Sequence, residues 1–257
     1  MKKLRYLTRL ITFILINLGF IAQLKSGIIV PFLFCYGCPL ASVGCPIGVL
    51  QNFIIRGRMP FYPCGVLILS GTLLGRSTCG LFCPFGAFQS ILDSLNKKIK
   101  FRRWLKRRSK GFPIVILLGT LILTSVLGTV TFCKLCPAGT LFATIPWYFI
   151  LRFNINYLFL LHIAMFVIVV FMTLFIGRFW CKYLCPLASM GVFNRISILT
   201  IEWDSDRCLR CMDCLRNCPM GISKLEDIGK SFDCILCGVC VDSCKNNCLR
   251  FKFNFKK

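Results

Sequence analysis

Four apolar stretches dominate the first two thirds of the chain. They cover residues 7–34, 61–75, 112–131 and 157–177. A helix that crosses a bilayer needs about 20 predominantly apolar residues, so the pattern predicts four transmembrane helices, of which the second must extend past these limits. Lys25 interrupts the first stretch. Either its side chain reaches the membrane interface, or the helix ends there and the chain re-enters the bilayer.

The apolar part contains an internal duplication. GRSTCGLFCPFGAF, from Gly75, aligns with GRFWCKYLCPLASM, from Gly177, at an offset of 102 residues, and FCYGCPL, from Phe34, aligns with FCKLCPA, from Phe132, at an offset of 98. Each half therefore reads as a span, a C-x2-C-P motif, an apolar helix, a second span and a C-x3-C-P motif. We expect an α-helical membrane protein in which residues 1–200 form a duplicated four-helix domain and residues 201–257 form a separate domain.

Composition supports a membrane protein. The chain is 56% hydrophobic with a mean hydropathy of +0.74, which is too apolar for a soluble protein with a short polar tail. Its 32 Lys and Arg against 9 Asp and Glu give a charge of +23. Nucleic acid would explain this charge, but nine basic residues fall in 96–110, between two apolar stretches. Such a loop is typical of a cytoplasmic segment at anionic lipid headgroups, so we expect a lipid partner and no nucleic acid.

Loop charges also orient the spans. One side of the predicted membrane holds, besides the basic loop, Lys2, Lys3, Arg5, Arg9, Arg76, Arg178, Lys182 and Arg195, and the other holds only Lys25, Arg56, Arg58, Lys134 and Arg152. Cytoplasmic loops contain the excess of Lys and Arg. The sequence therefore predicts a multi-pass protein of a prokaryotic cell membrane with both termini in the cytoplasm. The C-x3-C-P motifs then lie on the inner side and the C-x2-C-P motifs on the outer side.

Eight of the nineteen cysteines form two runs of the same spacing after residue 201. C-x2-C-x2-C-x3-C is the pattern of bacterial ferredoxins with two [4Fe–4S] clusters, in which the fourth Cys of each run binds the other cluster. Structural zinc sites instead pair two C-x2-C units, and a reducing cytoplasm disfavours disulfides. We predict an α+β ferredoxin domain with one cluster on Cys208, Cys211, Cys214 and Cys244 and another on Cys234, Cys237, Cys240 and Cys218.

The duplication gives two further quartets, which would hold one or two additional iron–sulfur clusters or metals. The inner one is Cys79, Cys83, Cys181 and Cys185, and the outer one is Cys35, Cys38, Cys133 and Cys136. Proline after the last Cys of each motif predicts that this Cys caps a helix whose N-terminus favours a thiolate. The alternatives are packed apolar thiols and, on the outer side, disulfides Cys35–Cys38 or Cys133–Cys136. Cys45-Pro46 repeats the pattern and is a spare outer candidate.

These motifs resemble the NapH-type membrane polyferredoxins, to which the NosR and CcoG types are related. The matching residues are the two C-x3-C-P motifs and the run DRCLRCMDCLRNCP from Asp206. The resemblance implies four transmembrane helices, cytoplasmic clusters and electron transfer from membrane quinol to a redox partner. This chain differs by its outer C-x2-C-P pair, which suggests an additional redox-active site near the outer surface.

We therefore expect an electron-transfer subunit of an oxidoreductase system rather than a stand-alone enzyme. It would relay electrons between its ferredoxin clusters and membrane quinol, a partner redox subunit or a soluble electron carrier. A second hypothesis is a metal-handling or assembly factor that reduces or transfers a soft metal such as Cu(I), which thiolates also favour. The seven Met residues do not support it, since none pairs with a Cys motif. A third, a redox-sensing regulator, lacks any added sensory or DNA-binding domain.

Overall fold

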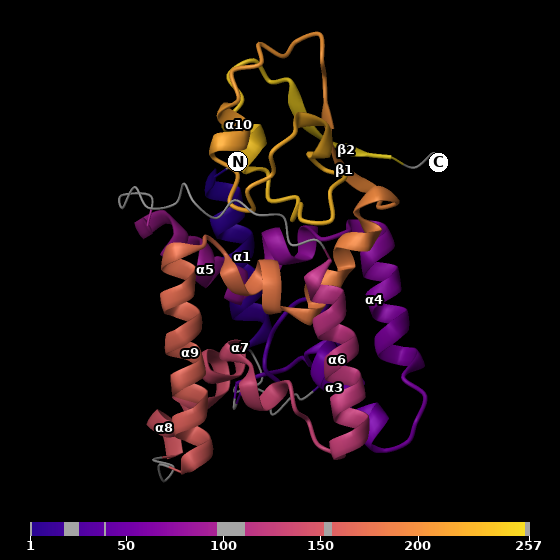
Figure 1. Cartoon of the computed structure of the whole chain (residues 1–257), viewed down its shortest axis with the longest axis vertical. Helices are drawn as coiled ribbons and strands as arrows, with labels where there is room; N and C mark the ends of the chain where they lie inside the picture. Colours follow the sequence, from indigo (N-terminus) through magenta and orange to yellow (C-terminus); the bar gives the residue numbers. More distant parts are fainter. Residues whose placement is uncertain (1, 18–25, 39, 97–110, 152–155, 255–257) are drawn as a thin grey trace.

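The computed structural model describes residues 2–17, 26–38, 40–96, 111–151 and 156–254, which form a bundle of helices with a small domain at one end (Figure 1). The main elements are α1 (Lys2–Ile16), α3 (Pro46–Ile55), α4 (Phe61–Leu74), η1 (Thr78–Phe82), α5 (Pro84–Asn96), α6 (Phe112–Leu127), η3 (Cys133–Leu135), α7 (Pro137–Gly139), η4 (Thr140–Thr144), α8 (Ile145–Leu151), α9 (Tyr157–Phe175), η5 (Trp180–Leu184), η6 (Pro186–Arg195), β1 (Leu199–Trp203), α10 (Asp213–Arg216), η7 (Leu225–Asp227), α11 (Val239–Asp242) and β2 (Leu249–Phe253). A mostly helical chain is confirmed.

Three of the four apolar stretches are single helices, as predicted. α6 and α9 begin and end close to the expected limits. The prediction that the second helix extends past residues 61–75 is wrong, because α4 has 14 residues and ends at Leu74, before Gly75, whose φ is 57°. α6 has proline in its first turn and ends at Gly128, whose φ of 59° is in the left-handed region and whose amide donates to the Thr124 carbonyl. Proline fits the first turn, where the amide has no helical partner, and glycine adopts positive φ without strain. Local sequence therefore sets both ends of this helix.

The prediction of one helix within residues 7–34 is wrong. α1 ends at Ile16, and residues 26–38 and 40–45 form loops and turns with an isolated bridge between Ile29 and Gly44. Asn17 closes the helix, because its side-chain amide donates to the Phe13 carbonyl at 2.7 Å. Gly27 and Pro31 follow, and both disfavour helix. Lys25 lies outside the described residues, as do residues 97–110 of the basic loop.

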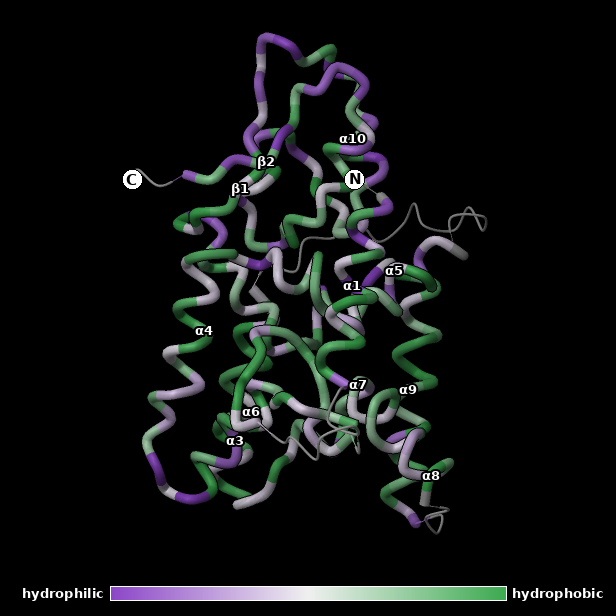
Figure 2. Tube along the Cα trace, turned by 180° about the vertical axis from the view of Figure 1, so that it is seen from behind, coloured by the Kyte–Doolittle hydropathy of each residue, from purple (hydrophilic) through white to green (hydrophobic). Residues whose placement is uncertain are grey.

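Among the described helices, α9 alone is long and apolar enough to cross a membrane, judged by length and composition. Only 11% of its most apolar 18-residue stretch is buried inside the structure. α3, α4 and α6 are apolar but have 10 to 16 residues. Figure 2 shows hydrophobic residues along most of α4, α6 and α9, whereas hydrophilic residues are frequent in the small domain at the other end.

The small domain, residues 199–254, is built around a two-stranded antiparallel sheet. β1 pairs with β2, with Leu199 opposite Phe253 and Ile201 opposite Phe251. Ile201, Leu236 and Leu249 are at most 2% exposed and belong to one apolar cluster with several of the cysteines. We call this unit the ferredoxin-like domain and the remainder the helical domain.

Two glycines let the ferredoxin-like domain approach the helical domain closely. A Cβ at Gly80 would clash with the Ile235 carbonyl oxygen, and one at Gly191 would clash with the Phe232 carbonyl oxygen. Side chains add hydrogen bonds across the same interface. The Asn194 amide donates to the carbonyls of Ser231 at 2.8 Å and Cys234 at 2.6 Å. The two domains therefore meet backbone to backbone, with little space for relative movement.

This contact gives a stability prediction. We expect Gly80→Ala to destabilise the purified protein by about 1–3 kcal/mol, the usual cost of overpacking, because the obstacle is backbone and cannot rotate away. Gly119→Ala in α6 is the matched control, since a Cβ there meets nothing within 4 Å. Thermal unfolding of the two variants compares them, and equal melting temperatures would show that the domains do not meet at Gly80.

Candidate functional site

The structure brings together one predicted quartet of the ferredoxin-like domain. The Cys240 thiol interacts electrostatically with Cys237, Cys234 and Cys218, so the fourth Cys of the first run lies with three of the second. Leu236 and Gly238 have φ of 48° and 69°, and these left-handed residues fold the chain around the sulfurs. A cavity lined by the same four cysteines lies between them. We call this quartet the proximal site.

The other predicted quartet lies farther from the helical domain, and we call it the distal site. Cys214 interacts with Cys208 and Cys211, and positive φ angles occur at Arg210 and Met212 between them. Cys244 comes from the second run, and its sulfur lies 2.9 Å from that of Cys248. Cys248 also interacts with Cys208, so it links the two runs. Cys248 belongs to neither ferredoxin run, so the spacing of the cysteines did not predict this contact.

Burial opposes free thiolates at the proximal site. It raises the pKa of Cys234 to about 12 and also raises the pKa of Cys240. Thiols with such pKa values are protonated at neutral pH, whereas a metal ligand must be a thiolate. Metal binding at these residues must therefore release protons. The free energy of binding must also offset the desolvation of the thiolates.

The inner quartet is also assembled. Cys185 interacts electrostatically with Cys181, Cys79 and Cys83. Cys83 and Cys185 are the extended residues before α5 and η6, with proline in the first helical turn of η6 as predicted. The Gly86 amide donates to the Cys83 sulfur at 3.3 Å. Four thiols from two repeated segments thus meet at the start of two helices, an arrangement suited to an iron–sulfur cluster.

Buried arginines surround the inner quartet. Arg178, Arg76 and Arg9 all interact with the Cys181 thiol, and Arg76 and Arg178 are only 1% and 2% exposed. Arg76 donates to the Cys181 carbonyl and, at 3.0 Å, to the Phe232 carbonyl of the ferredoxin-like domain. Positive charge at this density favours an anionic centre among the four sulfurs.

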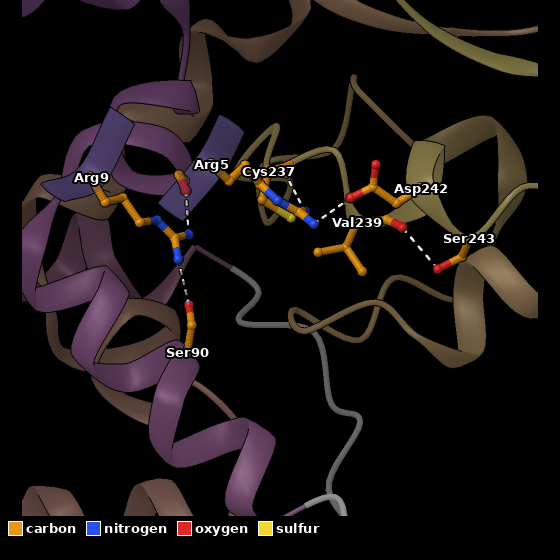
Figure 3. A network of polar contacts seen from close by, with 8 residues as sticks. Arg5, Arg9, Ser90, Cys237, Val239, Asp242 and Ser243 are labelled. Atoms are coloured by element: carbon orange, nitrogen blue, oxygen red, sulfur yellow. Dashed lines mark hydrogen bonds and ion pairs between the residues drawn. The ribbon is translucent and has the colours of Figure 1, made fainter. Parts of the chain in front are cut away.

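The inner quartet lies against the proximal site. Cys79 and Cys237 belong to one small buried cluster with Met220 and Ile235. Figure 3 shows Arg5 of α1 crossing this interface, where it donates to the Cys237 carbonyl at 2.8 Å and pairs with Asp242. In the same view Arg9 donates to Ser90 of α5. The arginines of α1 therefore tie the inner quartet and the proximal site to the same helix.

The outer cysteines are arranged differently from the prediction. Cys136 interacts with Cys45, Cys35 and Cys133, whereas the Cys38 sulfur points to the Asn17 side chain at 3.9 Å. The reason is local. The segment after Cys38 was expected to be helical from its start, but the helix there begins only at Pro46, with Cys45 as its cap. α3 and α7 both lie on the far side of the bundle from the sheet (Figure 1).

A single metal ion finds no ready site in the described part of the chain. No three His, Cys, Asp or Glu side chains there are close enough together to share one ion. A [4Fe–4S] cluster separates its thiolates by a core of iron and sulfide, so this finding concerns single ions and not clusters.

Comparison with known proteins identifies the kind of site. A family model described as a 4Fe-4S binding domain matches residues 57–102, 111–156 and 158–195, about half of the chain, and a second model with the same description matches residues 200–223. Each of the three segments of the first match contains one Cys-Pro motif of the helical domain, those at Cys83, Cys136 and Cys185. No solved structure matches the chain.

Several relatives cover most of the chain. Protein MJ0750 of Methanocaldococcus jannaschii is 28% identical over 83% of this chain and 88% of its own length. The ferredoxin-type protein NapH of Haemophilus influenzae is 30% identical over 74% of this chain and 67% of its own. YccM of Escherichia coli, whose name assigns it provisionally to electron transport, is 26% identical over 77% of this chain and 59% of its own. The chain therefore belongs to the family of 4Fe-4S ferredoxin-type proteins that includes NapH, and it is an iron–sulfur electron transport protein.

Proposed function

We propose that the chain relays electrons between a cytoplasmic ferredoxin-like domain and the membrane, through the inner quartet. The packing of Cys79 with Cys237 supports this most directly, because it makes the inner quartet and the proximal site neighbours. Iron–sulfur clusters bound at these thiols would supply one-electron chemistry. The chain holds the thiols in fixed positions, surrounds them with arginines and apolar side chains, and so excludes water from the path between them.

The proposal includes a membrane domain with four spans. Large apolar side chains on the outside of the bundle support it, since Phe61, Val126 and Leu160 are 78%, 75% and 63% exposed. They lie on α4, α6 and α9, so they would face lipid on three helices at once. Exposed apolar surface on this scale is unusual for a soluble monomer and typical of a membrane contact.

A quinol is the proposed partner within the bilayer. A groove of about 450 Å³ runs along α1 and the start of α5, and its lining is mostly apolar. Pro84, the residue after Cys83, forms part of its wall, as do Tyr6 and Arg9. The buried Nε of Arg9 has no hydrogen-bond partner among the described residues, so it could donate to a quinol oxygen. Such a site would place the headgroup beside the inner quartet.

The proposed orientation puts the ferredoxin-like domain in the cytoplasm. The basic residues of α1 and the buried Arg76 and Arg178 all lie toward this domain, as the positive-inside rule expects. Reporters fused after residue 257 and inserted in the basic loop 96–110 should both show cytoplasmic activity. A reporter inserted between Arg56 and Arg58 should show the opposite location. A cytoplasmic signal from all three positions, or an external one from the C-terminus, would contradict the topology.

The crosswise assignment, in which the fourth Cys of each run binds the cluster of the other run, gives a spectroscopic prediction. Cys218→Ser should remove or perturb the EPR signal of the cluster bound by Cys234, Cys237 and Cys240, because Cys218 lies with them. Cys248→Ser is the matched control, since Cys248 touches the distal site and should affect only that signal. Loss of the distal signal in Cys218→Ser would contradict the crosswise assignment.

The relay is tested by comparing two reductants, a quinol analogue that acts from the membrane and dithionite. In the double variant Cys83→Ser/Cys185→Ser we expect about four fewer iron atoms per chain. A lipid-soluble quinol analogue should then no longer reduce the ferredoxin-like clusters, although dithionite still does. Cys64→Ser, on the half-buried face of α4, is the control. Unchanged quinol reduction in the double variant would contradict the relay, and stoichiometric copper in the purified protein would favour metal handling instead.

A further inference from the structure

Four thiols meet on the side of the helical domain opposite the ferredoxin-like domain, and they are not the four that the repeat suggests. Cys35, Cys133 and Cys136 each interact electrostatically with Cys45. Cys38 interacts with Cys35 but not with the thiols of the other repeat, and its sulfur faces Asn17. The four mutually close residues all have free thiols.

In each of the two segments that carry these thiols, a glycine lies beside a cysteine of the other segment. A methyl group at Gly48, in the first turn of α3, would lie 3.5 Å from the Cys133 sulfur. A methyl group at Gly139, three residues after Cys136, would lie 3.8 Å from the Cys35 sulfur. Each pair of cysteines therefore touches a glycine from the segment that bears the other pair. The two segments therefore approach each other closely at these thiols, with a glycine at each contact.

Hydrogen-bond donors lie beside these thiols. The backbone amides of Gly48, Ile47 and Phe34 are directed toward the Cys45 sulfur, and in the inner quartet the Gly86 amide donates to the Cys83 sulfur. Gln51, one turn along α3, is 0% exposed, and its side-chain oxygen accepts from the Cys133 thiol at 3.6 Å. Its Nε2 has no partner among the described residues. A buried amide donor without a partner is costly, and rotation of the amide would direct it to a Cys133 thiolate.

We propose that Cys35, Cys45, Cys133 and Cys136 hold an iron–sulfur cluster on this side of the molecule, with Gln51 as a hydrogen-bond donor to it. The four sulfurs from two neighbouring segments and the unpartnered amide fit a thiolate-bound anionic cluster. Cys38 has no part in this site. The inference extends the proposed relay and rests on it for its role, but the presence of the site is independent of the quinol.

The site is connected to the inner quartet by aromatic side chains. Trp180 precedes Cys181, Phe132 precedes Cys133, and their ring centroids are 5.9 Å apart. The Cys83 thiol also lies 3.8 Å from the carbonyl of Leu33, two residues before Cys35. The inner quartet and the proposed outer site are therefore separated by only a thin layer of packed residues, Trp180 among them at 3% exposure.

Iron and acid-labile sulfide in the anaerobically purified full-length protein test the assignment. Cys45→Ser should lose about four iron and four sulfide per chain, whereas Cys38→Ser, the matched control, should lose none. The EPR signals of the ferredoxin-like domain should persist in both, which shows that the chain has folded. The proposal would be overturned if iron were lost in Cys38→Ser alone, equally in both variants, or in neither. It would also be overturned by a disulfide among the four thiols, or by zinc or copper in place of the iron.

Gln51→Leu provides a second measurement that does not depend on loss of a ligand. It should keep the full iron content but lower the reduction potential of the signal that Cys45→Ser removes, because an N–H donor to a cluster sulfur stabilises the reduced, more negative state. An unchanged potential would overturn the role of Gln51. If quinol reduces no cluster while the iron losses are as expected, the relay fails and the outer site stands.

Discussion

The rest of the structure depends on the cost of burying sulfur as an anion. A charge removed from water must be compensated by hydrogen bonds or opposite charge, and each group of thiols in the helical domain has such partners. The Cys83 sulfur accepts a hydrogen bond from an amide in the first turn of α5 at 3.3 Å, and amides in the first turn of α3 are directed toward the Cys45 sulfur. Proline after each of these cysteines supplies a helix start whose free amides are directed back toward the sulfur.

The same compensation joins the two domains. Arg76 interacts with the Cys181 thiol and also donates to the backbone of the ferredoxin-like domain at Phe232. Arg5 of α1 also joins the two domains, because it donates to the Cys237 carbonyl and pairs with Asp242. A buried guanidinium that has several donors can satisfy both partners at once. Stabilising the anionic sites and docking the ferredoxin-like domain are therefore not separate tasks in this molecule.

Sequence patterns predicted the elements whose limits depend on neighbouring residues in the chain. The limits of α6 and α9 follow from apolar length, proline and glycine, and the two ferredoxin runs follow from spacing. Tertiary features were missed. Nothing in the sequence shows that Asn17 would end α1 early, that Cys248 would lie between Cys208 and Cys244, or that Gln51 would be buried beside Cys133. The repeat gave a wrong prediction for Cys38, which was expected to join the outer quartet as Cys136 does. The two C-x2-C-P segments have equal spacing but different structures.

The two kinds of motif differ by one residue, and that residue decides the local fold. The C-x3-C segments close as π-helical turns, in which the Cys83 amide donates to Thr78 and the Cys185 amide to Trp180. The C-x2-C segments close shorter turns, and the Cys38 amide donates to the Cys35 carbonyl at 3.1 Å. A wider turn spreads its two cysteines over five residues and lets both face the neighbouring repeat. In the first C-x2-C motif only one of the two thiols reaches the neighbouring repeat, so the outer group takes its fourth member from the cap of the next helix, Cys45.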